Sequence, residues 1–512
     1  MKPPVQRKIV ALLAAQLLLS ACSATAQNWP QPAPDIRYTP PQLRMQPNFQ
    51  APSASHCARP IESREIPGTA SGQGGPAASL RDEGDSRLRK SLPARDSRAD
   101  ALAEARPAAP APAPALSPAP AYRSESLASG AGAAAKAAGE SADAASRHDM
   151  PPPFARPAPQ SHQPERPRME AVTAGMVDDN ADFTSYLAFR NRTRVEHRPR
   201  DVRERYLLEV KDARGRGVAD AEVAVQSPRG HAMWARTDTA GRVWLHPDAF
   251  DPSRSVVYDV AVRKDGRQAQ GYLKRGQKSS VEVRLDARPA APRARLDLVF
   301  LIDATGSMAD EIGKLKATLQ TIASDVAQLP SRPDLCFGLV AYRDKQDAFL
   351  LRSHDFTNDL GAFQGVLNAL HAGGGGDYPE AMNEALNETV HNLNWRGDGA
   401  TRLVFLIADA PPHLDYGGPQ YDDDMMAALG KGIKIFSVGA SGLNKQGEYI
   451  QRQMAQYTGG KFVFLTYDKA HNPASGPGRE TVHDVKNYSV DTLDRLIVRL
   501  VGDELGNLAK PE

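Results

Sequence analysis

The chain has 512 residues, and its 63 Lys and Arg residues nearly balance its 61 Asp and Glu residues, for a net charge of +2. This balance provides no strongly basic surface for a phosphate backbone, so we expect no nucleic-acid partner. With 41 Pro, 40 Gly and only 3 Cys, the composition indicates long stretches outside any core and excludes a disulfide-rich scaffold or a cysteine-based zinc module.

The N-terminus has the features of a secretion signal. Three basic residues precede an apolar run over residues 9–19, which is too short to span a bilayer stably. The run ends in Leu-Ser-Ala before Cys22, which resembles a bacterial lipoprotein signal. The resemblance implies that residues 1–21 are removed and that Cys22 is lipidated, which anchors the chain in the cell envelope. Ser23 favours the outer membrane of a Gram-negative cell, and an ordinary signal peptide or a short anchor is the alternative.

Residues 22–170 are dominated by Ala, Pro, Ser, Gly and Arg. This composition does not bury enough apolar surface to offset chain entropy, so we expect a disordered tether. A coil of this length reaches on the order of 70 Å, which predicts a folded part held well off the membrane. Cys57 lies in the tether and Cys336 on a strand pattern. A disulfide between them is one alternative, but we expect Cys336 to be a buried thiol.

A transitional segment follows at residues 171–202. Its apolar points between residues 183 and 189 predict at most a short helix that docks on a folded domain. The acidic residues at 178–182 resemble half of a calcium loop, but they lack the Gly and the distal Glu of an EF-hand. Chance clustering of acidic residues is the better interpretation.

Residues 203–286 change to short alternating runs separated by glycine-containing turns. Short strands at near-regular spacing predict an all-β sandwich. The pattern Asp-x-x-Gly-x-Gly-Val-x-x-Ala-x-Val, which begins at Asp212, resembles carboxypeptidase-regulatory-like modules of the immunoglobulin type. The resemblance implies a spacer or a binding module without catalysis.

Residues 294–506, after a short Pro-rich linker, alternate apolar runs with segments of helical period. The clearest helical stripes lie at residues 312–322 and 490–501, the second with Ser489 as its expected N-cap. This alternation predicts an α/β fold, with a doubly wound and mostly parallel sheet covered on both faces. The expected strands are Leu296–Ile302, Leu335–Tyr342, Leu403–Ile407, Ile433–Val438 and Phe462–Leu465.

Oxygen-bearing side chains follow two of these strands. Asp303, Thr305 and Ser307 occupy alternate positions after the first strand, and in a nearly extended loop alternate side chains converge on one point. Asp409 follows the strand that ends at Ile407. In such sheets ligands bind beyond the carboxyl ends of the strands. Because hard cations prefer carboxylate and hydroxyl oxygens, the sequence predicts a Mg²⁺ or Ca²⁺ site.

These loops, together with the run Gly373–Gly376, resemble the metal-ion-dependent adhesion site of von Willebrand factor A (VWA) domains. The first loop of that family reads Asp-x-Ser-x-Ser, and Thr305 replaces its first Ser. Many members use a Thr in the second loop, where this chain aligns Asp377. The resemblance implies direct coordination by the two hydroxyls, and a third carboxylate that strengthens cation binding but weakens the grip of the metal on a ligand carboxylate. The implied metal ligands are Asp303, Thr305, Ser307, Asp377 and Asp409.

The resemblance implies a cell-envelope lipoprotein whose cation organises a surface for a protein partner, in protein–protein interaction or adhesion. The alternative is an assembly scaffold in which the metal only rigidifies the loops. A metal-dependent hydrolase is less favoured, and we expect no enzyme, because Ser307 lacks a Gly-x-Ser-x-Gly elbow and the glycine run lacks the Lys of a P-loop. The tripeptide Arg396-Gly397-Asp398 is interpreted as a turn.

Overall fold

A computed structural model describes Cys57 and residues 63–69, 171–286, 293–397 and 399–508, all of which belong to one compact unit of the chain. The predicted signal peptide, the lipidated Cys22 and most of the predicted tether lie outside these residues. Within the described ranges, no helix combines the length and the apolar character needed to cross a membrane.

Five parallel strands form the centre of a large sheet, in the order β11-β10-β13-β14-β15. Each is an apolar run that is buried along most of its length, as expected for strands covered on both faces. The predicted mixed α/β fold with a large sheet is therefore confirmed. The strands are β10 (Arg295–Asp303), β11 (Asp334–Tyr342), β13 (Ala400–Ala408), β14 (Ile433–Gly439) and β15 (Phe462–Lys469).

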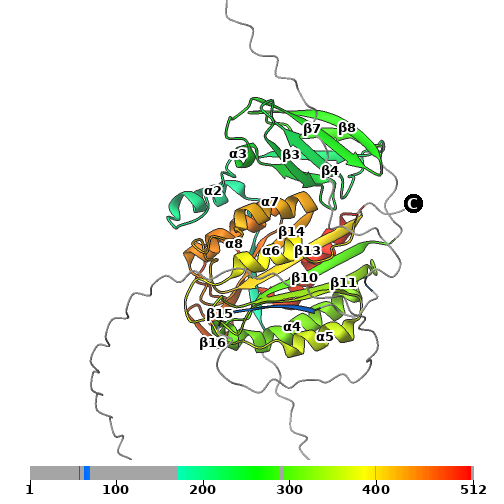
Figure 1. Ribbon diagram of the computed structural model, residues 1–512. Coiled ribbons are helices and arrows are strands. Elements are labelled where there is room, and N and C mark those ends of the chain that lie inside the picture. Colours follow the sequence, from blue (N-terminus) through cyan, green and yellow to red (C-terminus); the bar gives the residue numbers. More distant parts are fainter. Residues whose placement is uncertain (1–56, 58–62, 70–170, 287–292, 398, 509–512) are drawn as a thin grey trace, which may run out of the picture. The chain divides into compact units, whose positions relative to one another are not determined.

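Helices lie on both faces of this sheet (Figure 1). Along β10, Leu298 and Phe300 join one buried cluster, whereas Val299 and Leu301 join another, because successive side chains of a strand point to opposite faces. The first cluster includes residues of α4 (Ala309–Ala327), α5 (Leu360–Ala369) and α9 (Leu493–Gly506), and the second includes residues of α6 (Met382–His391), α7 (Tyr421–Lys431) and α8 (Lys445–Thr458).

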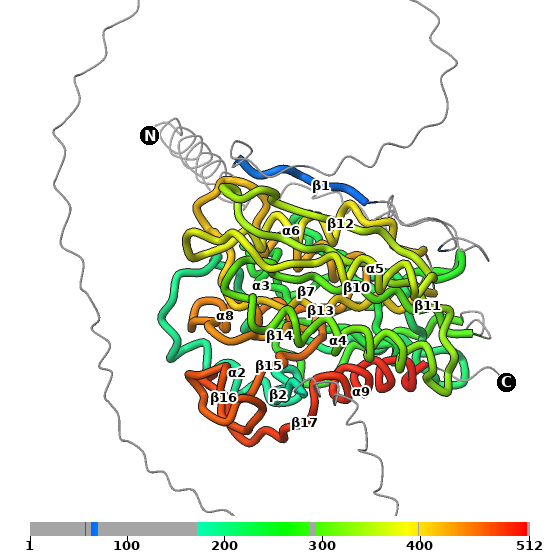
Figure 2. Tube along the Cα trace, turned by 90° about the horizontal axis from the view of Figure 1, so that it is seen from below, coloured from blue at the N-terminus to red at the C-terminus, as the bar shows by residue number. Residues whose placement is uncertain are grey.

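Antiparallel strands extend the sheet on both sides. On one side β12 pairs with β11, and β1 pairs with the outer side of β12 (Figure 2). On the other side β2 pairs with β15 and with the short β17, while β16 pairs with β15. These strands are β1 (Ser63–Pro67), β2 (Thr173–Val177), β12 (Phe349–Thr357), β16 (Asn472–Pro477) and β17 (Asp491–Thr492).

β1 belongs to the stretch predicted as a disordered tether, and the structure differs from that prediction here. Arg64 in β1 forms an ion pair with Glu388 of α6. A disulfide joins Cys57 to Cys336, with their Cα atoms 6.0 Å apart. The expectation of a free buried thiol at Cys336 was therefore wrong. Its physical premise was incomplete, because Cys336 is indeed fully buried, but Cys57 is buried beside it at 3% exposure.

The transitional segment at 171–202 packs on the large sheet and on α8. It contributes β2 and the helix α2 (Phe183–Arg192), whose Tyr186 and Phe189 are buried. Asp179 forms a buried ion pair with Arg452 of α8, with 2.6 Å between the closest charged atoms, and Asp182 caps the N-terminus of α2. The acidic residues therefore have structural partners, which agrees with the interpretation that they are not a calcium loop.

The β-rich part between Tyr206 and Arg284 contains two small sheets, ordered β6-β3-β9 and β5-β4-β7-β8. Alternate residues of both sheets are buried in one cluster, which continues into the side of the large sheet covered by α6, α7 and α8. The elements are β3 (Tyr206–Lys211), β4 (Glu222–Gln226), β5 (Ala232–Arg236), β6 (Arg242–Leu245), α3 (Pro247–Phe250), β7 (Val257–Lys264), β8 (Arg267–Lys274) and β9 (Val281–Arg284).

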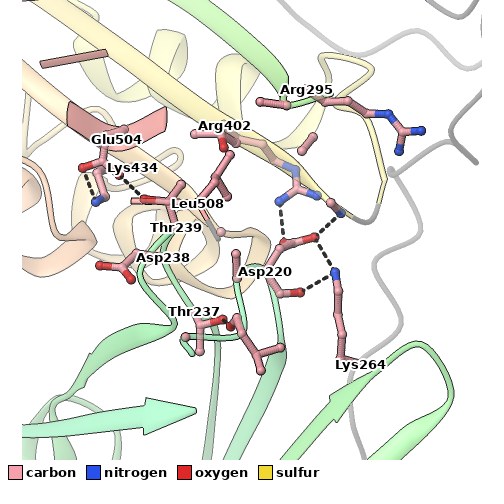
Figure 3. Close-up of a pocket in the computed structure, with 18 of the residues that line it drawn as sticks. Asp220, Thr237, Asp238, Thr239, Lys264, Arg295, Arg402, Lys434, Glu504 and Leu508 are labelled. Carbon is pink, nitrogen blue, oxygen red and sulfur yellow. Dashed lines mark hydrogen bonds and ion pairs between the residues drawn. The ribbon is translucent and has the colours of Figure 1, made fainter. Parts of the chain in front are cut away.

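Asp220, in the loop before β4, joins the β-rich part to the large sheet. Its carboxylate accepts hydrogen bonds from Arg402 of β13 at 2.8 Å and from Arg236 at 3.0 Å, and Lys264 lies 3.4 Å away. Figure 3 shows Asp220 between Arg402 and Lys264, at the wall of a pocket of about 350 Å³. The backbone N–H of Gly399 also donates to this carboxylate, at 2.6 Å. The buried carboxylate of Asp220 thus binds side chains of both the β-rich part and the large sheet.

Candidate metal centre

The first loop of the centre begins at the last residue of β10, Asp303, which is completely buried. The N–H and the hydroxyl of Thr305 donate to Asp303 Oδ1 at 3.0 and 2.6 Å. The hydroxyls of Thr305 and Ser307 lie 3.1 Å apart, and Ser307 is exposed to solvent. A 3₁₀ turn, η2 (Gly306–Met308), then leads into α4. The three side chains therefore converge as the sequence predicts.

The third loop brings Asp409 to the same place. β13 lies beside β10 in parallel register, with Ile407 opposite Ile302, so their carboxyl ends meet at one edge of the sheet. Burial raises the pKa of Asp409, and a hydrogen bond from Ser307 offsets part of this rise. Burial, together with the negative charge of Asp409, raises the pKa of Asp303 to about 7.

Two carboxylate oxygens at this edge, Asp303 Oδ2 and Asp409 Oδ1, are buried and have no hydrogen-bond partner within the described part of the chain. Buried charges are normally paired or bound to a metal, because their desolvation is costly. A donor set made only of carboxylate and hydroxyl oxygens suits a hard divalent cation. The residues present therefore fit Mg²⁺ or Ca²⁺.

The second loop approaches the first through its glycines. The N–H of Gly373 donates to the carbonyl of Ala304 at 3.1 Å, and the N–H of Gly306 donates to the carbonyl of Gly374 at 3.0 Å. At Gly375, where φ is +71°, a Cβ atom would lie 3.0 Å from the Cβ of Thr305. Both the left-handed backbone and this close approach favour glycine.

Asp377 is the ligand that the alignment of the second loop assigns to the centre. It is exposed, and its carboxylate lies within 4.8 Å of ligand atoms of Asp344 and His413. Among the described residues, Asp303, Asp377 and Asp409 do not form a cluster of this tightness. The glycines make the contact with the first loop, and this contact leaves Asp377 further along the loop, near the end of β11.

Glu380 is a buried carboxylate of the second loop that the sequence analysis missed. It is only 3% exposed, and its Oε2 has no hydrogen-bond partner among the described residues. Burial first, and then the charges of Asp303, Asp344 and other acids, raise its pKa to about 9. The N–H of Glu380 donates to the carbonyl of Pro411 at 3.1 Å, which joins the second loop to the third. Its place beside Pro379, directly before a helical pattern, was the available signal.

Arg396, the first residue of the Arg-Gly-Asp tripeptide, is completely buried. Its Nε donates to Asp297 of β10 at 2.5 Å, and its backbone N–H donates to the same carboxylate at 2.8 Å. This side chain holds the start of two strands together, so it is not presented to a partner.

Residues 297–416 match the family model described as the von Willebrand factor A domain. This part of the chain is therefore a VWA domain, which confirms the main resemblance drawn from the three loops. The match includes all three loops of the candidate centre.

Two curated relatives are similar to part of this chain. The chain is 29% identical over 141 residues to an alpha-protein kinase, vwkA, of Dictyostelium discoideum, an alignment that covers 27% of this chain and 22% of the relative. It is 30% identical over 123 residues to a putative ariadne-like RING finger protein, R811, of Acanthamoeba polyphaga mimivirus, covering 24% and 12%. The chain thus spans less than a quarter of the length of these relatives. The names describe those whole proteins.

Solved structures similar to the chain include the crystal structure of the pilus adhesin SpaC from Lactobacillus rhamnosus GG, in its open conformation. The sequence identity is 13% and the TM-score is 0.25, with 41% of this chain and 31% of the adhesin covered.

Proposed function

We propose that the VWA domain binds Mg²⁺ or Ca²⁺ through Asp303, Thr305, Ser307 and Asp409, and that the bound cation organises a docking surface for a protein partner. The observation that carries this proposal is a pair of buried carboxylates at the carboxyl ends of β10 and β13, each with one oxygen that has no hydrogen-bond partner among the described residues, together with the two adjacent hydroxyls of Thr305 and Ser307. VWA domains commonly bind divalent cations, and this class of domain supports a non-enzymatic binding role.

Each residue has a distinct part in this centre. Asp303 and Asp409 supply negative charge, and the rigid parallel strands that precede them fix their positions. Thr305 is completely buried, whereas Ser307 is exposed. The centre therefore has a closed side in the protein and an open side that faces solvent. A bound cation supplies a charged coordination position for an oxygen of a partner on the open side.

The alternative is a scaffold in which the cation only rigidifies the three loops. The same residues serve both functions, so the distinction lies in stability. In the scaffold, loss of the cation lowers the melting temperature strongly. In the docking function, loss of the cation removes partner binding and leaves the melting temperature nearly unchanged. A metal-dependent hydrolase is the least supported reading, and turnover of a phosphate or ester panel would be its sign.

The first test is a calorimetric titration of Mg²⁺ and Ca²⁺ into metal-stripped, full-length protein in detergent. We expect saturable binding. Asp303→Asn should weaken this binding by about 100-fold or more, because the substitution removes the charge of a metal ligand. Because protons compete for Asp303, whose pKa is raised to about 7, the affinity should fall as the pH is lowered from 8 to 6. Asp468→Asn, which changes an exposed acid near the end of β15, is the matched control. Equal binding by both variants would refute the site.

We further propose that a lipid on Cys22 holds the protein at the cell envelope, and at the outer membrane in a Gram-negative cell. The support is the signal-like N-terminus, with an apolar run that ends in Leu-Ser-Ala before the cysteine. In cells fed radiolabelled palmitate, the parent chain should incorporate label and sediment with membranes. Cys22→Ala should do neither. Labelling of the variant at the level of the parent would exclude this anchor.

A further inference from the structure

A second group of potential ligands lies beside the proposed Mg²⁺ or Ca²⁺ centre. Asp344, Asp377 and His413 each offer one ligand atom, and these atoms lie within 4.8 Å of one another. They come from three different loops: the end of β11, the glycine-rich second loop and the third loop after β13. None of them belongs to the set formed by Asp303, Thr305, Ser307 and Asp409.

His413 is the residue that points to a ligand. It is 5% exposed, and its Nδ1 lies 3.1 Å from Asp415 Oδ1. When the ring proton lies on Nδ1 and is donated to this carboxylate, a lone pair remains on Nε2. Nε2 has no hydrogen-bond partner among the described residues, and it faces Asp344 Oδ1 at 3.6 Å, too far for a hydrogen bond. A buried imidazole nitrogen thus lies within ion-pair distance of a carboxylate without a hydrogen bond to it.

Asp344 is also buried, and hydrogen bonds fix its carboxylate. It is 1% exposed, and the hydroxyl of Tyr416 donates to its Oδ1 and Oδ2 at 2.9 and 2.7 Å. The ring of Tyr416 stacks on His413, with ring centroids 3.5 Å apart and planes inclined by 12°. Metal-binding histidines usually donate their other N–H to a carboxylate, and ligating carboxylates accept hydrogen bonds from outer residues. Asp415 and Tyr416 supply both kinds of support.

We propose that Asp344, Asp377 and His413 form a second metal site, which takes a divalent transition metal such as Zn²⁺, Co²⁺ or Mn²⁺. An imidazole nitrogen with two carboxylates is a donor set for these ions, whereas the all-oxygen centre beside it suits Mg²⁺ or Ca²⁺. Two of the three ligands are buried, and Asp377 is exposed. The metal is therefore bound at the protein surface, with one side open to water.

The test uses Co²⁺, whose visible absorption reports coordination by protein ligands. Metal-stripped, full-length protein is titrated with Co²⁺ in the presence of excess Mg²⁺, which saturates the all-oxygen centre. We expect one Co²⁺ per chain, displaced by Zn²⁺. Asp377→Asn and His413→Asn should weaken Co²⁺ binding by about 100-fold or more, and Asp415→Asn by about tenfold, because it removes the acceptor that orients the imidazole.

Two variants keep the experiment decisive. Asp377 is exposed, so its replacement should leave the fold intact even where His413→Asn does not, and circular dichroism checks this. Asp303→Asn should retain Co²⁺ binding while it loses Mg²⁺ binding, which separates this site from the proposed centre. The proposal is overturned if the parent binds no Co²⁺ under excess Mg²⁺, or if Asp377→Asn binds Co²⁺ as tightly as the parent.

Discussion

Replacement of Asp220 by Asn is expected to destabilise the protein by about 3–5 kcal/mol, because it removes the negative charge from a buried ion-pair network. The side chains of Arg236 and Arg402 are only 2% and 1% exposed, and both donate to Asp220. Asn keeps the size of the side chain and loses its charge. Urea unfolding followed by circular dichroism measures the loss. A change below about 1 kcal/mol would show that this carboxylate does not hold the two parts together.

Asp265→Asn is the matched control for this substitution. Both aspartates have a positive φ, 54° at Asp220 and 50° at Asp265, and Asn tolerates this conformation. Asp265 is exposed at the turn between β7 and β8, so its replacement should change the free energy of unfolding by less than about 0.5 kcal/mol. The difference between the two variants therefore isolates the buried charge.

The contribution of Asp220 should also depend on pH. Burial alone would raise its pKa, but the positive charges of Arg236, Arg402 and Lys264 outweigh burial and lower the pKa below its ordinary value of 3.8. A lowered folded-state pKa means that the stabilisation is complete above pH 3.8 and decreases as the pH falls below it. The advantage of the parent over Asp220→Asn should therefore be constant from pH 8 to pH 5 and shrink only under stronger acid.

Loss of the disulfide is the second change with a large expected effect. Cys57→Ser should lower the free energy of unfolding by about 2–5 kcal/mol, because the bond closes a loop between residues 279 positions apart and limits the unfolded chain. Urea unfolding with and without a reductant measures this. The reductant should lower the stability of the parent to that of the variant and leave the variant unchanged. A parent insensitive to reductant would mean that the bond contributes nothing.

The same variant should loosen β1. Four of its five residues are exposed, and only Ile66 packs against the core. With so little buried apolar surface, the strand depends on its pairing with β12 and on the nearby disulfide. Hydrogen exchange at the amides of β1 should therefore accelerate in Cys57→Ser before exchange in β10 or β11 changes.

The central strands could be predicted from the sequence, because a strand covered on both faces leaves a continuous apolar run. The added strands leave no such pattern. Ser63–Pro67 reads Ser-Arg-Glu-Ile-Pro and pairs with β12, whose residues lie nearly 290 positions further along the chain. Tertiary contacts, and not local preference, decide such a strand. The last helix begins at Leu493 with Thr492 as its N-cap, later than the predicted Ser489, because Asp491 and Thr492 pair with β2.

Tertiary contacts that the local sequence does not reveal also decide the burial of the helix α8. Its Gln451, Arg452 and Gln453 are almost completely buried, although such side chains predict a solvent-exposed face. Arg452 is covered because Asp179 pairs with it and the ring of Phe189 lies 3.9 Å from its guanidinium carbon. The segment that covers this helix lies more than 250 residues earlier in the chain, so no local pattern reveals the burial.

The candidate centre likewise contains residues whose positions the sequence could predict and residues whose positions it could not. Asp303 and Asp409 directly follow neighbouring parallel strands, and the register of the sheet then brings them together. Asp377 lies in a loop whose path depends on the contacts of its glycines, and an alignment of loop residues does not contain that path. Glu380 was missed for a related reason, because its place beside Pro379 marks the start of a helix but does not show that the carboxylate is buried.

The disulfide changes how a mechanical load would pass through the molecule if Cys22 carries the lipid. A pull on Cys22 would enter the fold at Cys57, about 35 residues later in the chain. Cys336 lies opposite Asp297 on β10, the strand that ends in Asp303. Force from a partner held at the cation would thus cross only the neighbouring strands β10 and β11 before it reaches the Cys57–Cys336 disulfide.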